Sequence, residues 1–250
     1  MEKSQIKIGP KALRVLKGIS TISQSLTIRN DYLYTKFEAS PEEKSKKGAN
    51  NVVVEYVLPE GEIEIEKEFG LFDVEEFLRV NSSFDPDSLK LEIQGNAIFI
   101  SDKRKKSTYF TQSTLGMPTK NEAGDKLFEN GEIAIGMILT DSDLELIKKD
   151  LSVLPFNNLI AKVDGEKDVK IISGNDVTSN ATEIKINEEL VSLTLPDFEF
   201  TFPNEDIFSL LIPGSYALVI KKCDYNGNVI KIAKFVSKTI AGLTYTLVSH

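Results

Sequence analysis

Hydrophobic residues recur at helical spacing in GPKALRVLKGIS, the stretch from Gly9 to Ser20. Plotted at about 100° per residue, one half of the wheel carries Ala12, Leu13, Val15, Leu16, Ile19 and Ile22. The opposite arc carries Lys11, Arg14, Lys17 and Thr21, so all of its charges are positive. Pro10 suits the first position of a helix, and Gly9 before it is an acceptable cap. The pattern predicts an amphipathic helix with a basic outer face, a pattern most often found on solvated surface helices.

A helix followed by strands appears again in the next part of the chain. FDVEEFLRVNSSF opens with Asp73, and Glu76 three residues later has the spacing of a capping box. LKLEIQGNAIFIS then alternates apolar and polar residues on both sides of Gly95-Asn96, which predicts a hairpin. The polar arc of this second helix carries Arg79 beside Glu75 and Ser82, so it is only weakly charged.

Two further copies of this pattern follow. TDSDLELIKKDLSVL predicts a third helix, followed by two strands around a polar turn at Gly165. PNEDIFSLLIPG begins the fourth copy, whose hairpin turns at Asn226-Gly227, a strong signal for a tight turn. The four helices begin near residues 11, 73, 141 and 205, so they are spaced by 62, 68 and 64 residues. This regular spacing indicates a fourfold internal repeat of a helix and several strands.

The longest stretch without clear periodicity separates the second copy from the third. It runs from Ser113 to Gly131, and we interpret it as a connector between domains. The predicted domains are therefore 1–113 and 131–250, with a connector at 114–130. The predicted class is α+β, with two similar domains that each contain two helix-plus-antiparallel-sheet repeats.

Composition narrows the possible functions. The chain has 250 residues and a formal net charge of −8, which argues against general affinity for polyanions but not against a local basic surface. No apolar run is long enough to span a bilayer, and the N-terminus lacks the apolar region of a signal peptide. One cysteine, Cys223, excludes an internal disulfide and suggests a reducing compartment. We therefore expect a cytoplasmic protein.

The sequence offers little catalytic chemistry. Its only histidine is His250, which removes most metal sites and most acid–base pairs. The pairs Asp85-x-Asp87 and Asp141-x-Asp143 stand where turns form or helices start, so capping explains them best. We expect no catalytic residues, no metal and no cofactor. A charge-rich segment, DKRKKS from Asp102 to Ser107, is expected to link two strands.

These features together resemble a known family, the DNA sliding clamps that serve as polymerase processivity factors. The resemblance is closest to clamps of T4-type tailed bacteriophages, and it covers nearly the whole chain. It rests on KALRVLKGISTIS, FDVEEFLRVNSSFDPDSLKLEIQGNAIFISD, DLELIKKDL and LLIPGSYALVIKK in this order. The insert at 42–50 and a connector poor in proline depart from the family pattern.

The resemblance implies a homotrimeric ring of six domains, with twelve helices lining a hole. Helices about 9 Å apart would form an axis circle about 34 Å across. Subtracting about 5 Å of helix radius on each side leaves about 24 Å, enough for a DNA duplex. The polar helix faces would then point at phosphates. The residues expected to face DNA are Lys11, Arg14, Lys17, Arg79, Lys148 and Lys149.

Subunit contacts and a partner site follow from the same resemblance. Edge strands of neighbouring subunits would pair through STYFTQS and DVKIIS, unless these are ordinary paired strands within one sheet. The expected interface residues are Tyr109, Phe110, Val169 and Ile171. A partner peptide would enter an apolar pocket, although a core position explains each candidate equally well. The pocket candidates are Leu115, Met117, Pro118, Val229, Ile230, Tyr245 and Leu247.

The resemblance implies three partners: double-stranded DNA, a DNA polymerase and an ATP-dependent clamp loader. The DNA would be bound without sequence preference. In a phage, late-transcription factors would be further partners. The location would then be the host cytoplasm, and the function viral DNA replication. Two alternatives stay open: a β-rich structural or assembly protein of a virion, and a small enzyme. The virion protein would explain the repeats and the acidic surface, but not the basic face of the first helix.

Overall fold

The chain divides into two units, which are described separately. Unit 1 comprises Met1–Phe37 and Val54–Lys120, and unit 2 comprises Glu38–Val53 and Asn121–His250. The structure, a computed structural model, describes residues 4–21, 23–38, 51–113, 117, 120, 122–153, 159–164, 168–174, 182–186, 191–193, 195, 197–202 and 207–249. The predicted insert at 42–50, the turn at Gly165, and Leu115 and Pro118 lie outside these ranges.

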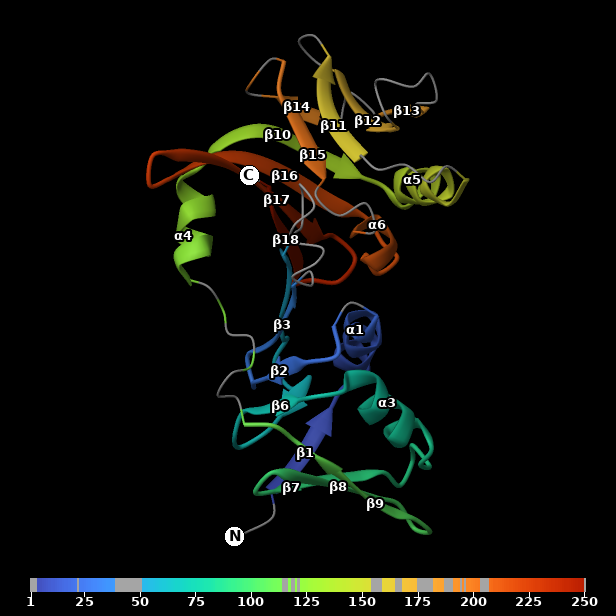
Figure 1. The fold of residues 1–250 in the computed structure, drawn as a ribbon. Helices are drawn as coiled ribbons and strands as arrows, with labels where there is room; N and C mark the ends of the chain where they lie inside the picture. The colour runs from blue at the N-terminus through green and yellow to red at the C-terminus, as the bar shows by residue number, and fades with distance from the viewer. Residues whose placement is uncertain are drawn as a thin grey trace. The chain divides into compact units, whose positions relative to one another are not determined.

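The elements up to Lys120 form two antiparallel arrangements (Figure 1). In chain order they are β1 (Ser4–Ile8), α1 (Pro10–Ser20), β2 (Leu26–Ile28), β3 (Tyr32–Glu38), β4 (Asn51–Val57), β5 (Ile63–Glu64), β6 (Phe69–Leu71), α3 (Val74–Ser82), β7 (Lys90–Gln94), β8 (Ala97–Ser101) and β9 (Lys106–Phe110). One set of hydrogen-bonded neighbours runs β5-β1-β7-β8-β9, and the other runs β4-β3-β2-β6. Helices α1 and α3 pack against each other.

The elements after Asn121 repeat this arrangement. In chain order they are α4 (Glu122–Asn130), β10 (Glu132–Leu139), α5 (Asp141–Val153), β11 (Leu159–Asp164), β12 (Asp168–Ser173), β13 (Thr182–Lys185), β14 (Val191–Leu193), β15 (Glu199–Phe202), α6 (Ile207–Leu210), β16 (Tyr216–Tyr225), β17 (Asn228–Ser237) and β18 (Leu243–Ser249). The neighbours run β14-β10-β16-β17-β18 and β13-β12-β11-β15. Helices α5 and α6 pack against each other.

The two units have the same strand order. Adding nine to each strand number of unit 1 reproduces both orders of unit 2. The helices agree as well, since α1 and α5 follow the first strand of their units, and α3 and α6 precede the long hairpins. The predicted α+β fold of two similar halves with antiparallel sheets is confirmed. A regular repeat in the sequence therefore corresponds to a duplicated topology.

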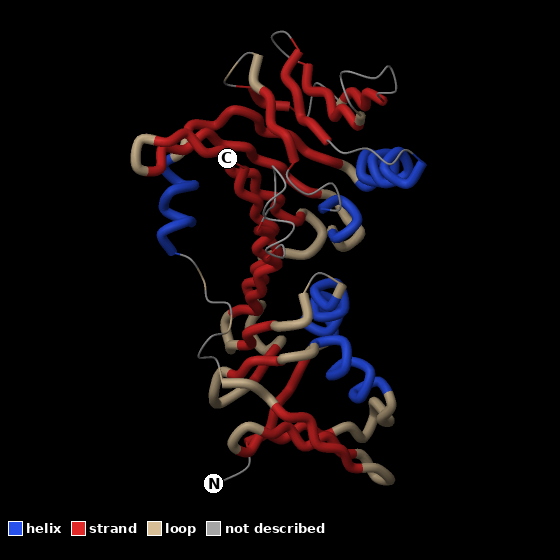
Figure 2. Tube along the Cα trace, in the orientation of Figure 1, coloured by secondary structure: helices blue, strands red, loops and turns tan. Residues whose placement is uncertain are grey.

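The helices match the predicted positions with two differences. α1, α3 and α5 begin within one residue of the expected starts. α6 is only four residues long, whereas the sequence suggested a longer fourth helix; residues 203–206 before it lie outside the described ranges. The predicted connector contains a helix, α4, which the sequence analysis did not predict. Figure 2 shows α4 beside the hairpin end of β16 and β17, with α6 at their opposite end.

Both predicted hairpin turns have the expected backbone. Gly95 has φ +63°, and Asn226 and Gly227 have φ +54° and +80°. The two consecutive positive values at Asn226-Gly227 are those of a type I′ turn, whereas the single positive value at the first turn residue, Gly95, fits a type II′ turn. Both turn types have a twist that matches that of the strands. These turns set the β7–β8 and β16–β17 registers, which pair Gln94 with Ala97 and Tyr225 with Asn228.

Each unit buries its own aromatic side chains. In unit 1, Phe77 of α3 meets Tyr109 of β9 edge to face, with ring centroids 5.4 Å apart. In unit 2, a cluster of aromatic rings joins α6 to the sheets: Phe200, Phe202, Phe208, Tyr216, Phe235 and Tyr245. Edge-to-face pairs of this kind stabilise a core beyond the area that they bury. These cores fix the helices on their sheets, and so decide which helix faces stay exposed.

Candidate nucleic-acid interface

Helix α1 presents its three cations on the exposed side. Lys11, Arg14 and Lys17 are exposed, whereas the opposite side of the helix is fully buried through Ala12, Val15, Leu16 and Ile19. Placing four apolar side chains in the core fixes the rotation of the helix, because turning it would expose them to water. The sequence therefore predicted the orientation of this face within unit 1 correctly.

The start of α1 is held by a carboxylate from elsewhere in the unit. Gly9 has no side chain to cap the helix, and its backbone N–H donates to the Glu62 carbonyl at 2.6 Å. The Glu62 carboxylate accepts from the Ala12 N–H at 3.1 Å. A negative group at a helix N-terminus is favourable because it complements the helix dipole. A side chain at position 9 would meet Glu62 Oε2 at 2.3 Å, so only glycine permits this approach.

Helix α3 adds one cation to the exposed surface of unit 1. Asp73 caps it by accepting from the Glu76 N–H at 2.8 Å. The Asp73 N–H donates instead to the Tyr109 hydroxyl at 3.0 Å, and that hydroxyl donates to the Asp73 carbonyl at 2.8 Å. Arg79 is exposed in the last turn, and Glu75 and Glu76 are exposed in the first. α1 packs against α3, so unit 1 carries exposed cations on two neighbouring helices, three on α1 and one on α3.

Helix α5 of unit 2 is also capped at its start and also carries lysines, but only one of its two lysines is exposed. Thr140 and Asp143 cap it reciprocally, through Thr140 N–H to Asp143 Oδ2 at 2.8 Å and Asp143 N–H to Thr140 Oγ1 at 3.2 Å. Lys149 is exposed, but Lys148 is half-buried and donates to the Leu211 carbonyl at 3.3 Å. Burial lowers the pKa of Lys148, although Asp141 and Glu145 act in the opposite direction. Lys148 therefore links α5 to the segment after α6.

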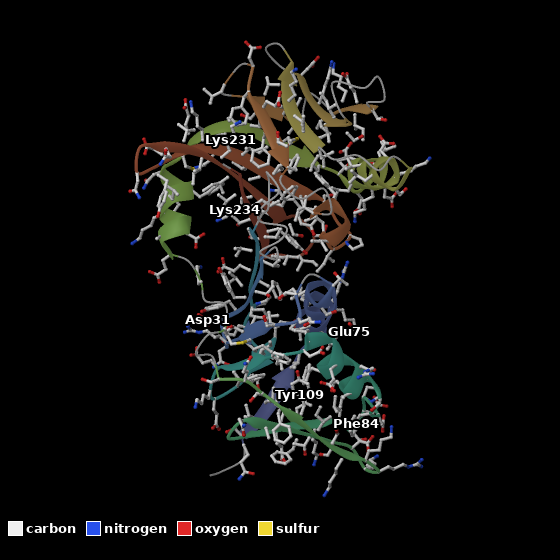
Figure 3. All side chains as sticks on the ribbon, in the orientation of Figure 1. Asp31, Glu75, Phe84, Tyr109, Lys231 and Lys234 are labelled. Atoms are coloured by element: carbon white, nitrogen blue, oxygen red, sulfur yellow. The ribbon has the colours of Figure 1, made fainter. Side chains whose placement is uncertain are left out.

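The expected interface strands differ in how they are paired. β9 is the last strand of its sheet, with β8 as its paired neighbour. Tyr109 on this strand points into unit 1 and is 7% exposed, whereas Phe110 is 69% exposed (Figure 3). Phe72 is also 63% exposed, and the Gly70–Gln112 bridge places it opposite Phe110. The sequence analysis missed Phe72, although its position directly before the helix cap was a signal that it lies outside the core.

The second expected strand lies inside its sheet. β12 pairs with β11 on one side and with β13 on the other, and its Val169 and Ile171 side chains are buried. The outer strand next to β12 is β13, which the sequence analysis did not single out. β9 and β13 are therefore two of the strands that end a sheet in the described part of the chain, together with β5, β6, β14 and β15.

The described candidates for the partner pocket belong to both units. Met117 is buried in unit 1, where its side chain would meet a Cβ placed on Gly70. In unit 2, Tyr245 and Leu247 are buried, and Ile230 packs with Cys223, Ile232, Leu127 and Phe128. Val229 alone of the described candidates is largely exposed, at 54%.

The described ranges offer little support for other kinds of site. No group of three or more His, Cys, Asp and Glu side chains could hold a metal ion there. No described helix is long and apolar enough to cross a membrane. Burial raises the pKa of the Cys223 thiol, which disfavours the reactive thiolate. Asp85 accepts from the Asp87 N–H and from the Ser88 hydroxyl, so it orders a turn.

Comparison with known proteins rests on structure. No protein-family model and no curated protein sequence matches the chain. Among solved structures, the PCNA2–PCNA3 complex from Sulfolobus tokodaii matches with a TM-score of 0.59 and 12% identity, over 99% of this chain and 98% of the other. A. fulgidus PCNA, solved with the C-terminal region of FEN-1 bound, matches with a TM-score of 0.61 and 13% identity, over 100% and 97%.

A bacterial clamp is similar over a smaller part of its own length. The H. pylori beta clamp matches with a TM-score of 0.63 and 11% identity, over 99% of this chain and 63% of that one. These identities are low, so the matches establish the fold and not the family. The chain has the fold of the DNA sliding clamps over its whole length.

Proposed function

We propose that this protein is a sliding clamp that encircles double-stranded DNA and tethers a replicative DNA polymerase. The observation that carries the proposal is the face of α1, whose exposed charges are three cations on a chain of net charge −8. A clamp fold supplies a reason for such a face, because helices that line a ring meet the phosphates of the duplex. The cations would attract DNA without reading its sequence, since phosphates carry no base information.

The ring would be a homotrimer closed by head-to-tail contacts. We assign these contacts to the edges of β9 and β13, which end their sheets among the described strands. Backbone groups of an edge strand are available to pair with another chain. Phe110 and Phe72 would add apolar contact, and Tyr109, Val169 and Ile171 would support the interface from inside their units.

The protein would act without catalysing a reaction and without a cofactor. Holding the polymerase close to the primer end raises its effective concentration there. An ATP-dependent loader would open the ring. In a T4-type phage, the clamp would act in the host cytoplasm during DNA replication, and it would also bind late-transcription factors. A partner peptide would bind near Leu115, Met117, Pro118 and Val229, with Ile230, Tyr245 and Leu247 as supporting residues.

The test is primer extension on singly primed circular DNA with the cognate polymerase, loader and ATP. A clamp is expected to give long products that depend on the protein, the loader and ATP together. Linear templates with free ends serve as the control, because a topologically held ring slides off them. Short products with every component active would favour the structural virion protein instead.

A further inference from the structure

The segment Asp102–Ser107, which contains the turn between β8 and β9 and the first two residues of β9, is the most concentrated basic stretch of the chain, and its cations have no role in the proposal so far. Lys103, Arg104, Lys105 and Lys106 are consecutive and all exposed. Arg79 of α3 borders the same surface, because an open hollow of about 540 Å³ is lined by residues of both elements. Its lining residues are Arg79, Val80, Ser83, Phe84, Lys105, Lys106 and Ser107.

The loop is held in place by its single acidic residue. Asp102 Oδ1 accepts from the backbone N–H groups of Arg104 and Lys105, at 2.7 and 2.6 Å. Asp102 Oδ2 accepts from the Asp85 N–H at 3.1 Å. The N–H groups of Arg104 and Asp85 lower the pKa of Asp102. The negative charge is therefore bound to the backbone, while the basic side chains extend into solvent.

Lys105 fastens the loop to the end of α3. Its ammonium donates to the Ser83 carbonyl and lies 5.6 Å from the centre of the Phe84 ring. This contact fixes the distance between the loop and Arg79. In the described part of the chain, Arg79, Lys103, Arg104 and Lys106 make no ion pair, so their charges are not neutralised by the protein.

We propose that Arg79, the turn residues Lys103 and Arg104, and Lys106 at the start of β9 form a binding site for backbone phosphates of duplex DNA. Arg79 connects this site to α3, which packs against α1. The proposal rests on the proposed function and adds phosphate contacts from outside the helices to that of Arg79. An acidic peptide fits less well, since Phe84 is buried here beneath Lys105 and offers no apolar anchor for a peptide side chain.

The experiment measures binding of a fluorescent duplex of about 30 base pairs by anisotropy, at salt concentrations from 50 to 200 mM. The test variant is Lys103→Ala/Arg104→Ala/Lys106→Ala. The control is Lys67→Ala/Lys126→Ala/Lys222→Ala, which removes the same charge from exposed positions elsewhere. Each lost phosphate contact lowers the slope of log affinity against log salt by about 0.9. Over this range the unaltered protein should therefore lose roughly 40-fold more affinity than the test variant.

Each outcome decides the proposal. The proposal is supported if only the test variant binds the duplex more weakly and with a shallower salt slope. It is also supported if Lys103→Arg/Lys106→Arg, which keeps the charges, retains duplex binding. Equal losses in test and control variants would show a general charge effect and overturn it. Unchanged duplex binding in the test variant overturns the proposal as well. If that variant instead loses binding to a polyglutamate peptide or to the loader, the site binds an acidic protein and not DNA, and the proposal is again overturned. Primer extension with the unaltered protein tests the clamp function separately, so failure of one proposal does not imply failure of the other.

Discussion

At the scale of single residues, position in the fold decides which charges can act on a ligand. Lys11, Arg14 and Lys17 share one exposed helix face, whereas Lys148 is half-buried and bound to a carbonyl. All four were expected to meet DNA, because helical spacing indicates a face but not the depth of a side chain. Depth depends on neighbouring segments, here the Leu211 carbonyl after α6.

We predict that Lys11→Ala/Arg14→Ala/Lys17→Ala leaves the fold intact and weakens duplex binding. The side chains are exposed and alanine favours the helix, so the thermal midpoint should change little. The salt slope should fall by up to about 2.7 if each cation contacts one phosphate. Anisotropy titrations and circular dichroism measure the two effects. Unchanged binding and unchanged primer extension would remove α1 from the DNA interface.

Two buried tyrosines predict a loss of stability in alkali. Burial raises the pKa of Tyr245 to about 12 from its ordinary value near 10, and burial raises the pKa of Tyr216 further. The unfolded chain therefore loses these protons first, and stability that is complete below pH 10 declines as the pH rises toward 12. Tyr245 accounts for a loss of about 3 kcal/mol in the free energy of unfolding between pH 10 and pH 12.

The variant Tyr245→Phe should make that alkaline decline shallower. Its urea unfolding free energy is compared with that of the unaltered protein at pH 8, 10 and 11. A modest loss of about 1 kcal/mol is expected at pH 8, because the Ile212 N–H loses its acceptor. Identical alkaline slopes in the two proteins would show that Tyr245 does not resist ionisation in the fold.

At the scale of elements, the helices and hairpins with strong local signals were predictable, and α4 was not. α1 has four apolar residues at helical spacing and a proline at its first position, and the β16–β17 turn has Asn226-Gly227. α4 spans only nine residues, includes Gly124 and has no fully buried residue, so its local helix signal is weak. It forms because Leu127 and Phe128 pack on Cys223, Ile230 and Ile232, about a hundred residues away.

The packing of α4 depends on one aromatic ring between two lysines. The ammonium groups of Lys221 and Lys234 lie 4.9 and 4.8 Å from the centre of the Phe128 ring. Lys234 also pairs with Asp125 at 3.1 Å, and Lys221 donates to the Glu129 carbonyl at 3.1 Å. Figure 3 shows Lys234 on β17 together with Lys231. Cation–π contacts of this kind contribute about 0.5–2 kcal/mol each.

We predict that Phe128→Ala releases α4 while the rest of unit 2 stays folded. Hydrogen exchange of the amides at 122–130 should rise by tenfold or more, because about 1.4 kcal/mol of lost docking energy corresponds to a factor of ten. Exchange in β16 and β17 beyond the contact should change little. Phe128→Leu keeps the apolar bulk of the side chain but removes the ring. Comparing the two variants therefore separates the contribution of the cation–π contacts from that of apolar packing. Unaltered exchange in both variants would show that other contacts hold α4.

At the scale of the whole molecule, the main feature of the fold is that both halves have the same strand order. Both halves place a helix after the first strand and a second helix before the long hairpin, and β9 and β13 are among the strands that end their sheets. The repeat was visible in the sequence as regular helix spacing. The identity of the outer strands was not, since β12 looked as suitable an edge as β9 until β13 was seen to cover it.

We predict that Phe72→Ser/Phe110→Ser abolishes self-assembly without unfolding the chain. Both rings are exposed within unit 1, so their loss removes contact between copies and not core packing. Light scattering should give the mass of three chains for the unaltered protein at micromolar concentration, and the mass of one chain for the variant. Val57→Ser, another exposed apolar residue of unit 1, serves as the control. A monomer at every concentration of the unaltered protein would exclude a self-assembling ring.

The sequence by itself determined the features that arise from neighbouring residues: the apolar and basic sides of α1, the Asp73 cap, the hairpin turns and the fourfold spacing of helices. Tertiary structure alone decided the rest, namely the α4 helix, the burial of Tyr109 and Lys148, and the choice of outer strands. The reason is the range of the interactions. A helical stripe or a turn is specified within a few residues, whereas burial and strand pairing depend on segments far apart in the chain.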